Sequence, residues 1–190
     1  MNKLALKVVF LFAAIFSLLI TSCQKEANMD PAGMMWVGNS PGSDNQKPAY
    51  DIKLENKFRN KNGTYTWIWS VTNTRPGDGA PGSGTSQDLQ SWGFTLSGCA
   101  GLGQIISGST SPDGISWKNF NPEIKSVNSL QGGAQEAMMF EQGTVSNQKS
   151  YYKLLVTRNF STDDKVKAVY KSGDLTGSGT IVVSGIGCPL

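Results

Sequence analysis

From residue 50 onward, apolar and polar residues alternate with a period of two, and this pattern restricts the fold to β-sheets. The clearest case is segment 64–72, whose apolar positions are Tyr65, Trp67, Trp69 and Val71. Period two places alternate side chains on opposite faces of a strand. An Asn62-Gly63 pair precedes the segment, and Asn-Gly is the preferred sequence of a tight hairpin turn. We therefore predict a β-hairpin here, with Ile52, Leu54 and Phe58 on its first strand and Trp67 and Trp69 in the core.

Further short strands are expected along the rest of the chain. They are 92–96, 104–107, 115–118, 137–142, 151–158, 165–171 and 179–184. A helical turn is expected only within 127–140, which Gly132-Gly133 interrupts. The chain has 22 glycines and 8 prolines, which suit many tight turns. Together these features predict an all-β domain, an antiparallel β-sandwich of the immunoglobulin-like kind, over residues 49–190. A closed β-barrel is the second choice, because strand spacing does not separate the two.

The first 23 residues have the organisation of a secretory signal. Lys3 and Lys7 precede an apolar run over 8–20, and small residues then lead to Cys23. The run is too short for a transmembrane helix, which needs about 20 residues. The sequence Ile20-Thr21-Ser22-Cys23 resembles the lipobox of bacterial lipoproteins. This resemblance implies that residues 1–22 are removed and that Cys23 carries lipid. The polar composition of the segment up to residue 48, with its proline and glycine residues, predicts a flexible tether over 23–48. The alternative is an ordinary signal peptide with a cysteine there by chance.

The residues after Cys23 indicate which membrane holds the protein. Gln24 takes the place of the aspartate that often retains lipoproteins at the inner membrane. Gln24-Lys25-Glu26 is similar to the export signal that sends some lipoproteins of the Bacteroidota to the outer face of the outer membrane. An ordinary solvated linker is the alternative. We expect a lipid-anchored protein of the outer membrane, presented at the cell surface.

Histidine is absent, which excludes several kinds of site. Ser-His-Asp and Cys-His catalysis and histidine-ligated zinc all require this residue. The cysteines other than Cys23 are Cys99 and Cys188. Outside the cytoplasm such a pair most often forms a disulfide, and a metal site would need more soft ligands. We therefore predict a Cys99–Cys188 disulfide.

Three segments resemble an all-β domain of secreted and surface bacterial proteins. They are Thr66 to Asn73, Leu89-Gln90-Ser91-Trp92 followed by Cys99, and the glycine-rich segment from Gly177 to Gly185 followed by Cys188. Ser91 stands where that family has a histidine, so any role of the histidine is absent here. The resemblance implies a sandwich over about residues 50–188 and supports the disulfide. It implies no activity.

The balance of charged residues indicates whether to expect a nucleic-acid partner, and the positions of the carboxylates indicate whether to expect catalysis. Without residues 1–22 the chain has 15 basic and 14 acidic residues, so we expect no nucleic-acid partner. Paired carboxylates are the only acid–base apparatus available. The candidates are Asp78, Asp88, Asp113, Glu123, Glu136, Glu141, Asp163, Asp164 and Asp174. No spacing singles out a pair among them, so we expect a protein that is not an enzyme. A carboxylate-dependent hydrolase of an extracellular polymer is the alternative.

Two features remain as candidate binding elements. Asp78 and Asp88 bracket a long glycine-rich loop over 75–88, where ordinary turns are expected and a structural calcium ion is the alternative. No other cofactor is expected. Trp117 follows an Asp113-Gly114 turn and is the tryptophan most suited to stacking on a sugar. The sequence thus predicts a non-catalytic binding or structural module, with a glycan or a protein as ligand and its lipid in the membrane.

Overall fold

The computed structural model describes residues 48–96, 98, 100–128 and 134–190. In these residues the chain forms ten β-strands, a short 3-10 helix and no α-helix. The elements are β1 (Tyr50–Arg59), β2 (Tyr65–Asn73), β3 (Leu89–Thr95), η1 (Leu102–Gln104), β4 (Ile105–Ser111), β5 (Lys118–Phe120), β6 (Glu123–Asn128), β7 (Ala134–Phe140), β8 (Lys149–Val156), β9 (Phe160–Ser172) and β10 (Ser178–Pro189). The predicted all-β class is confirmed.

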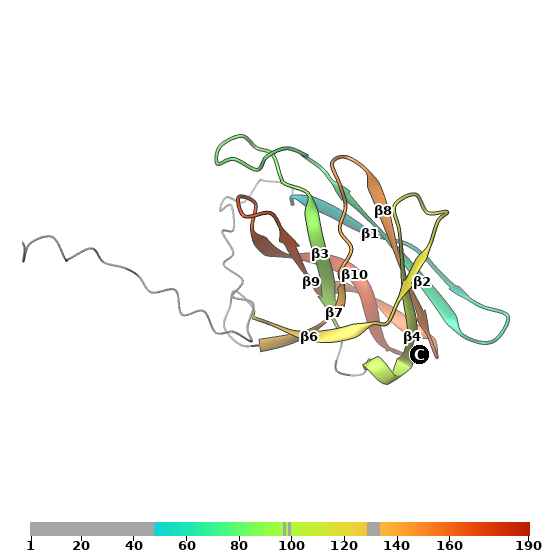
Figure 1. The fold of residues 1–190 in the computed structure, drawn as a ribbon. Helices are drawn as coiled ribbons and strands as arrows, with labels where there is room; N and C mark the ends of the chain where they lie inside the picture. Colours follow the sequence, from blue (N-terminus) through green and yellow to red (C-terminus); the bar gives the residue numbers. More distant parts are fainter. Residues whose placement is uncertain (1–47, 97, 99, 129–133) are drawn as a thin grey trace, which may run out of the picture. The chain divides into compact units, whose positions relative to one another are not determined.

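The strands form two antiparallel sheets that pack face to face (Figure 1). The first sheet has the order β1-β2-β8-β4-β5 and the second has the order β10-β9-β3-β7-β6. Aromatic rings join the two inner faces. Trp69 on β2 lies 5.1 Å from Phe94 on β3, and Trp92 on β3 lies 5.2 Å from Tyr152 on β8, between ring centroids. The described strands therefore make two stacked layers and not the closed barrel that was the second choice.

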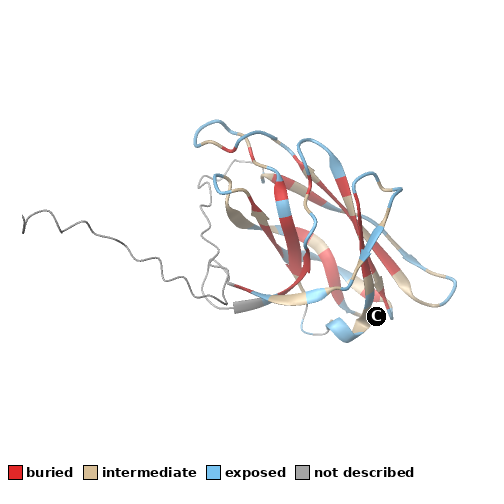
Figure 2. Ribbon diagram, in the orientation of Figure 1, coloured by how far each residue is buried: buried red, intermediate tan, exposed pale blue. Residues whose placement is uncertain are grey.

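The predicted hairpin is present and supplies the centre of the core. Asn60 and Thr64 close the turn, with the Asn60 N–H donating to the Thr64 carbonyl at 2.8 Å. Gly63 has φ of 87°, a value that favours glycine. Trp67 and Trp69 are fully buried, as the alternation predicts. Figure 2 shows that buried residues are concentrated in the strands and exposed residues in the loops. Their burial confirms that these rings fill the core and are not exposed stacking platforms.

A β-bulge in β1 changes which lysines face water. The pairing of β1 with β2 shifts between Leu54 and Asn56, and the extra residue reverses the alternation beyond it. Lys53 is exposed, whereas Lys57 pairs with Trp67 and its ammonium group lies 4.8 Å from the centroid of that ring. Unbroken alternation along β1 would place both lysines on the outer face, and the bulge turns Lys57 toward Trp67 instead.

Two sequence predictions between residues 115 and 140 are wrong. The strand expected at 115–118 begins only at Lys118, because the N–H groups of Ile115 and Ser116 bind the Asp113 carboxylate at 2.8 Å each. No helical turn occupies the described parts of 127–140, since β6 and β7 pair there from Glu123↔Met139 to Asn128↔Ala134. Long-range pairing, which a single segment does not reveal, decides the structure of β6.

Several sequence predictions lie outside the described residues. These are the signal segment 1–22, the lipidated Cys23, the tether up to residue 47 and Cys99. No helix in the described part of the chain is long and apolar enough to cross a membrane.

Candidate functional site

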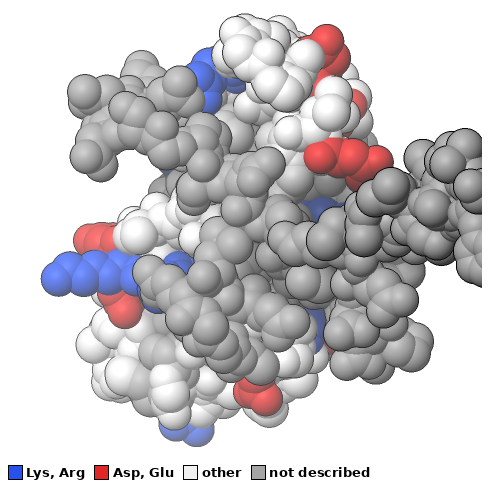
Figure 3. Space-filling view, turned by 90° about the vertical axis from the view of Figure 1, so that its left-hand side faces the viewer, with Lys and Arg blue, Asp and Glu red and all other residues white. Residues whose placement is uncertain are grey.

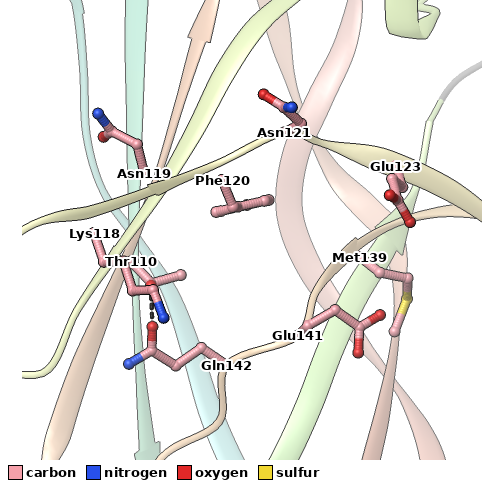
Figure 4. A pocket seen from close by; sticks show the side chains of 9 residues that line it. All are labelled: Thr110, Lys118, Asn119, Phe120, Asn121, Glu123, Met139, Glu141 and Gln142. Carbon is pink, nitrogen blue, oxygen red and sulfur yellow. Dashed lines mark hydrogen bonds between the residues drawn. The ribbon is translucent and has the colours of Figure 1, made fainter.

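A pocket of about 380 Å³ opens where the edge strands of the two sheets meet (Figure 4). β5 is the last strand of the first sheet, β6 is the last strand of the second, and Asn121 and Pro122 link them. The lining residues are Thr110, Lys118, Asn119, Phe120, Asn121, Glu123, Met139, Glu141 and Gln142. A volume of this size lies within the range of small-molecule sites.

Phe120 is the aromatic residue of the pocket, and the core holds its ring. The ring meets Phe140 edge-on, with centroids 5.6 Å apart and planes at 74°. On its other side it packs on Gly108, where an added Cβ would lie 2.3 Å from the ring. Gly108 on β4 pairs directly with Phe120. Because glycine has no side chain, the ring of Phe120 fits against the backbone at this position. Phe120 thus offers a fixed apolar surface to a ligand.

Polar side chains from β4, from β6 and from the segment after β7 lie around this ring. On one side, the Thr110 hydroxyl donates to the Gln142 side-chain oxygen in a short hydrogen bond. On the other side, Glu123 and Glu141 lie beside Met139 (Figure 4). β5 adds Asn119 at the rim of the pocket, on the outward face of the strand, where its Oδ1 accepts a 2.8 Å hydrogen bond from the Ser109 hydroxyl (Figure 4). These hydroxyl, amide and carboxylate groups can donate and accept several hydrogen bonds to one ligand.

The charges at the pocket are partly balanced. Lys125 donates to Glu141 at 2.6 Å, and this hydrogen bond raises the pKa of the lysine above its usual value. Glu123 reinforces the shift through its charge. In the view of Figure 3, the acidic and basic side chains of described residues lie in small separate groups. The lining thus includes two carboxylates and one lysine, Lys118, and Lys125 pairs with Glu141 beside it.

The pocket brings together two carboxylates that no sequence spacing singled out. Glu123 and Glu141 both line it, and both side chains are exposed. The acid catalyst of a glycosidase normally has a desolvated carboxyl group, which keeps its proton near neutral pH. Exposed carboxylates, one of them already paired with Lys125, are better placed to accept hydrogen bonds from a bound ligand.

Trp117 lies next to the pocket, one residue before β5. The ring is half-buried, and its Nε1 donates to the Gly114 carbonyl at 3.2 Å. The ammonium group of Lys153, on β8, lies 4.0 Å from the ring centroid. The ring is thus partly exposed, as stacking on a sugar requires, and a lysine lies over it.

The turn that positions Trp117 depends on one carboxylate. Asp113 accepts hydrogen bonds from the N–H groups of Ser116 and Ile115, which lower its pKa to about 2. Protonation at low pH removes these bonds, so the turn is expected to be intact at pH 4 and to loosen as the pH falls through about 2. The Trp117 indole N–H signal in NMR spectra should shift in that range and not between pH 6 and 4. An Asp113→Ala protein should show the loosened signal at every pH, and an unchanged signal in this variant would contradict the prediction.

Asp78 and Asp88 serve separate turns. Asp78 accepts hydrogen bonds from the Ala80 N–H at 3.0 Å and the Thr85 hydroxyl at 3.2 Å, and these bonds lower its pKa. Asp88 accepts a 2.6 Å hydrogen bond from the Ser146 N–H. No group of three or more Cys, Asp and Glu residues that could hold a metal ion occurs among the described residues. The turns expected at these positions are present, and the two carboxylates do not form a joint binding site with each other.

The loop between them is tied to the domain at its base. The Gly77 N–H donates to the Ser86 carbonyl at 3.0 Å, and the Ser86 N–H donates to the Arg75 carbonyl at 2.6 Å. The Gln87 side-chain oxygen accepts hydrogen bonds from the N–H groups of Leu175 and Thr176, at 2.7 and 2.9 Å. Gln87 therefore connects this loop to the turn between β9 and β10, a structural role that explains its position without a ligand.

Most of the pocket residues were missed by the sequence analysis. Phe120, Asn119, Asn121 and Gln142 stand out neither by composition nor by spacing. The one local signal is the Asn-Phe-Asn-Pro sequence at 119–122, an aromatic residue between amides just before a proline. No protein-family model matches the chain, and no curated protein is significantly similar to it.

Proposed function

We propose that this chain is a lipid-anchored module of the bacterial cell envelope that binds a glycan at the pocket between β5 and β6 without cleaving it. The pocket carries the proposal. It combines one fixed aromatic ring with hydroxyl, amide and carboxylate groups in an open space of about 380 Å³. A sugar has an apolar ring face and several hydroxyl groups, each able to donate and to accept. Phe120 suits the first feature and the polar lining suits the second.

Pocket variants test this proposal directly. Glu123→Gln and Asn119→Ala should each weaken binding to a retained polysaccharide by about tenfold, because the first replaces a charged acceptor oxygen by a neutral amide donor and the second removes an amide. Glu136→Gln is the matched control, since Glu136 is exposed on β7 and does not line the pocket. Affinity gel electrophoresis against a panel of polysaccharides gives the dissociation constants. Equal binding by all variants, or retention by no polysaccharide, would contradict the proposal, and in the second case a protein ligand becomes the better candidate.

The anchor is proposed from the N-terminal sequence. Its basic residues, apolar run and Cys23 support lipidation, and Gln24-Lys25-Glu26 supports the outer face of the outer membrane. Two or more acyl chains anchor stably, at about 0.8 kcal/mol per buried CH₂. Protease shaving of intact cells should remove the protein while a periplasmic control survives. Protection until lysis would place the protein in the periplasm instead.

The lipid has its own test. Cys23→Ser should abolish labelling with an alkyne fatty acid and release the protein from the membrane fraction, because no other group is expected to carry acyl chains. Cys188→Ser, which leaves Cys23 in place, should keep both the label and the membrane attachment. An unlabelled Cys23→Ser protein that still sediments with membranes would show that the anchor lies elsewhere.

We also propose an immunoglobulin-like strand arrangement and the Cys99–Cys188 disulfide. In immunoglobulin domains the sheets have the strand orders ABED and GFC, with a buried tryptophan on strand C. The orders β1-β2-β8-β4 and β10-β9-β3 are comparable, and Trp92 on β3 is fully buried. β3 and β10 both run antiparallel to β9, so both end at the same edge of the sheet. This placement supports a bridge from Cys188, near the end of β10, to Cys99, four residues after β3.

Hydrolysis of an extracellular polymer is the second candidate function. Glu123 and Glu141 in one pocket favour it, because a pair of carboxylates suffices for glycoside hydrolysis. The exposure of both side chains and the Lys125–Glu141 ion pair count against it.

A further inference from the structure

From the pairing of Trp117 with Lys153 we infer a second subsite, which binds the carboxylate of an acidic sugar in the glycan. This inference rests on the proposed function, because it concerns a further part of the same ligand. Trp117 and Lys153 lie on the outward face of the first sheet, away from the core. Leu154, the next residue of β8, is fully buried in the core. Because side chains alternate along a strand, Lys153 faces outward, as do its pairing partners Ile68 and Ser109.

Lys153 has no acidic partner among the described residues. The ion pairs there are Asp51–Lys53, Glu141–Lys125 and Glu55–Lys149, and none includes Lys153. Two acidic groups on this face already have partners. Asp113, in the turn beside Trp117, accepts hydrogen bonds from the Ser111 hydroxyl and the N–H groups of Ile115 and Ser116, at 2.8 Å each. Glu55 is held by Lys149 at 2.5 Å and by the Ser70 hydroxyl at 2.6 Å. Burial lowers the pKa of Lys153, which marks a partly desolvated ammonium group. A partly desolvated cation of this kind gains more from an incoming carboxylate than a fully hydrated surface lysine does.

Trp117 supplies the apolar part of the subsite. The hydrogen bond from its Nε1 to Gly114 and the Lys153 contact hold the indole in one orientation. Lysine occupies one face of the ring, and the half-buried indole retains exposed surface on which a sugar can stack. A sugar stacked there has Lys153 as its nearest cation. A uronic acid, which joins a sugar ring to a carboxylate, matches both groups.

The subsite and the ring of Phe120 lie on the two opposite faces of the edge strand β5. Asn119 lines the pocket, and it pairs with Ser109, which in turn pairs with Lys153. Trp117 directly precedes β5, and Phe120 ends it. The four positions 117–120 therefore hold both the stacking residue Trp117 and the pocket residues Asn119 and Phe120. A polysaccharide chain crossing this edge would meet both, with a neutral sugar at Phe120 and an acidic sugar at Trp117.

The experiment compares uronic-acid polysaccharides with their carboxyl-reduced forms. The probes are polygalacturonate, alginate and xanthan, each tested beside its own reduced polymer with the mature protein. The wild type should bind at least one acidic polymer about tenfold more tightly than its reduced form. Lys153→Met, which keeps a long apolar stem, should lose this preference, and Lys153→Arg should keep it. Lys165→Met is the control, because Lys165 is exposed on β9 of the other sheet.

The outcomes separate the two proposals. If the wild type binds a reduced polymer as tightly as the acidic form in every pair, the acidic subsite is wrong and the glycan-binding function stands. If it binds no polymer of either form, the glycan function fails as well. If Lys153→Met keeps the preference but has a lower melting temperature, the Trp117–Lys153 contact only stabilises the fold, and the subsite is overturned.

Discussion

Replacing Trp69 by alanine is expected to lower the free energy of unfolding by about 3–5 kcal/mol, as usual for large aromatic residues in a core. Trp69 is fully buried and touches both sheets. Its ring stacks on Trp67 with centroids 5.8 Å apart and lies 5.1 Å from Phe94. Its Nε1 also donates to the Ser184 carbonyl on β10 at 2.8 Å, so alanine would leave a cavity and an unpaired carbonyl. A loss of this size is comparable to the whole stability of many domains.

Urea unfolding followed by circular dichroism measures this effect. Trp69→Phe separates its two causes, since phenylalanine fills most of the volume and cannot donate to Ser184. Its expected loss is smaller than that of alanine and larger than zero. Trp117→Ala is the comparison outside the core and should cost less, because that ring is only half-buried. Equal losses for Trp69→Ala and Trp117→Ala would contradict the placement of Trp69 at the centre of the sandwich.

Reduction of the proposed disulfide is expected to lower the free energy of unfolding by about 4 kcal/mol, the chain-entropy value for a closed loop of about 90 residues. The bridge would join the segment after β3 to the end of β10. Without it, the last pairs of β9 and β10 are expected to separate first. Those pairs include Pro189↔Phe160, beyond an irregularity in the register.

Mass spectrometry with and without reductant tests the bridge itself. Alkylation should label Cys99 and Cys188 only after reduction, and urea unfolding of the reduced protein should show the lower midpoint. Cys188→Ser should reproduce the loss without reductant. Labelling of both thiols in the native, unreduced protein would disprove the disulfide.

The core could be predicted from the sequence because local pattern and burial agree there. The Asn62-Gly63 turn and the alternation after it correctly placed Trp67 and Trp69 in the interior. The same alternation failed at Lys57, because one extra residue in β1 reverses the faces beyond it. No strand was predicted at β6, and a helical turn was expected within 127–140, because the pairing of β6 with β7 cannot be read from either segment alone. Patterns of single strands thus predict which residues are buried better than they predict register.

The pocket could not be predicted for a related reason. Its lining comes from β4, β5, β6 and β7, and from the residues that follow β7. Glu123 and Glu141 are separated in the sequence by a complete hairpin, so their approach depends on the β6–β7 register. Trp117 could be singled out because its turn is local. Its lysine neighbour could not, since Lys153 belongs to β8 and reaches the ring only through the order of the first sheet.

The central claim is that the pocket retains a glycan and does not cleave it. The most direct test incubates the mature protein for a day with each polysaccharide that it binds, and then measures reducing ends and chain length. We predict retention without new reducing ends, for the wild type and for Glu136→Gln alike. New reducing ends that disappear in Glu123→Gln and Glu141→Gln would contradict this account and make the protein a hydrolase.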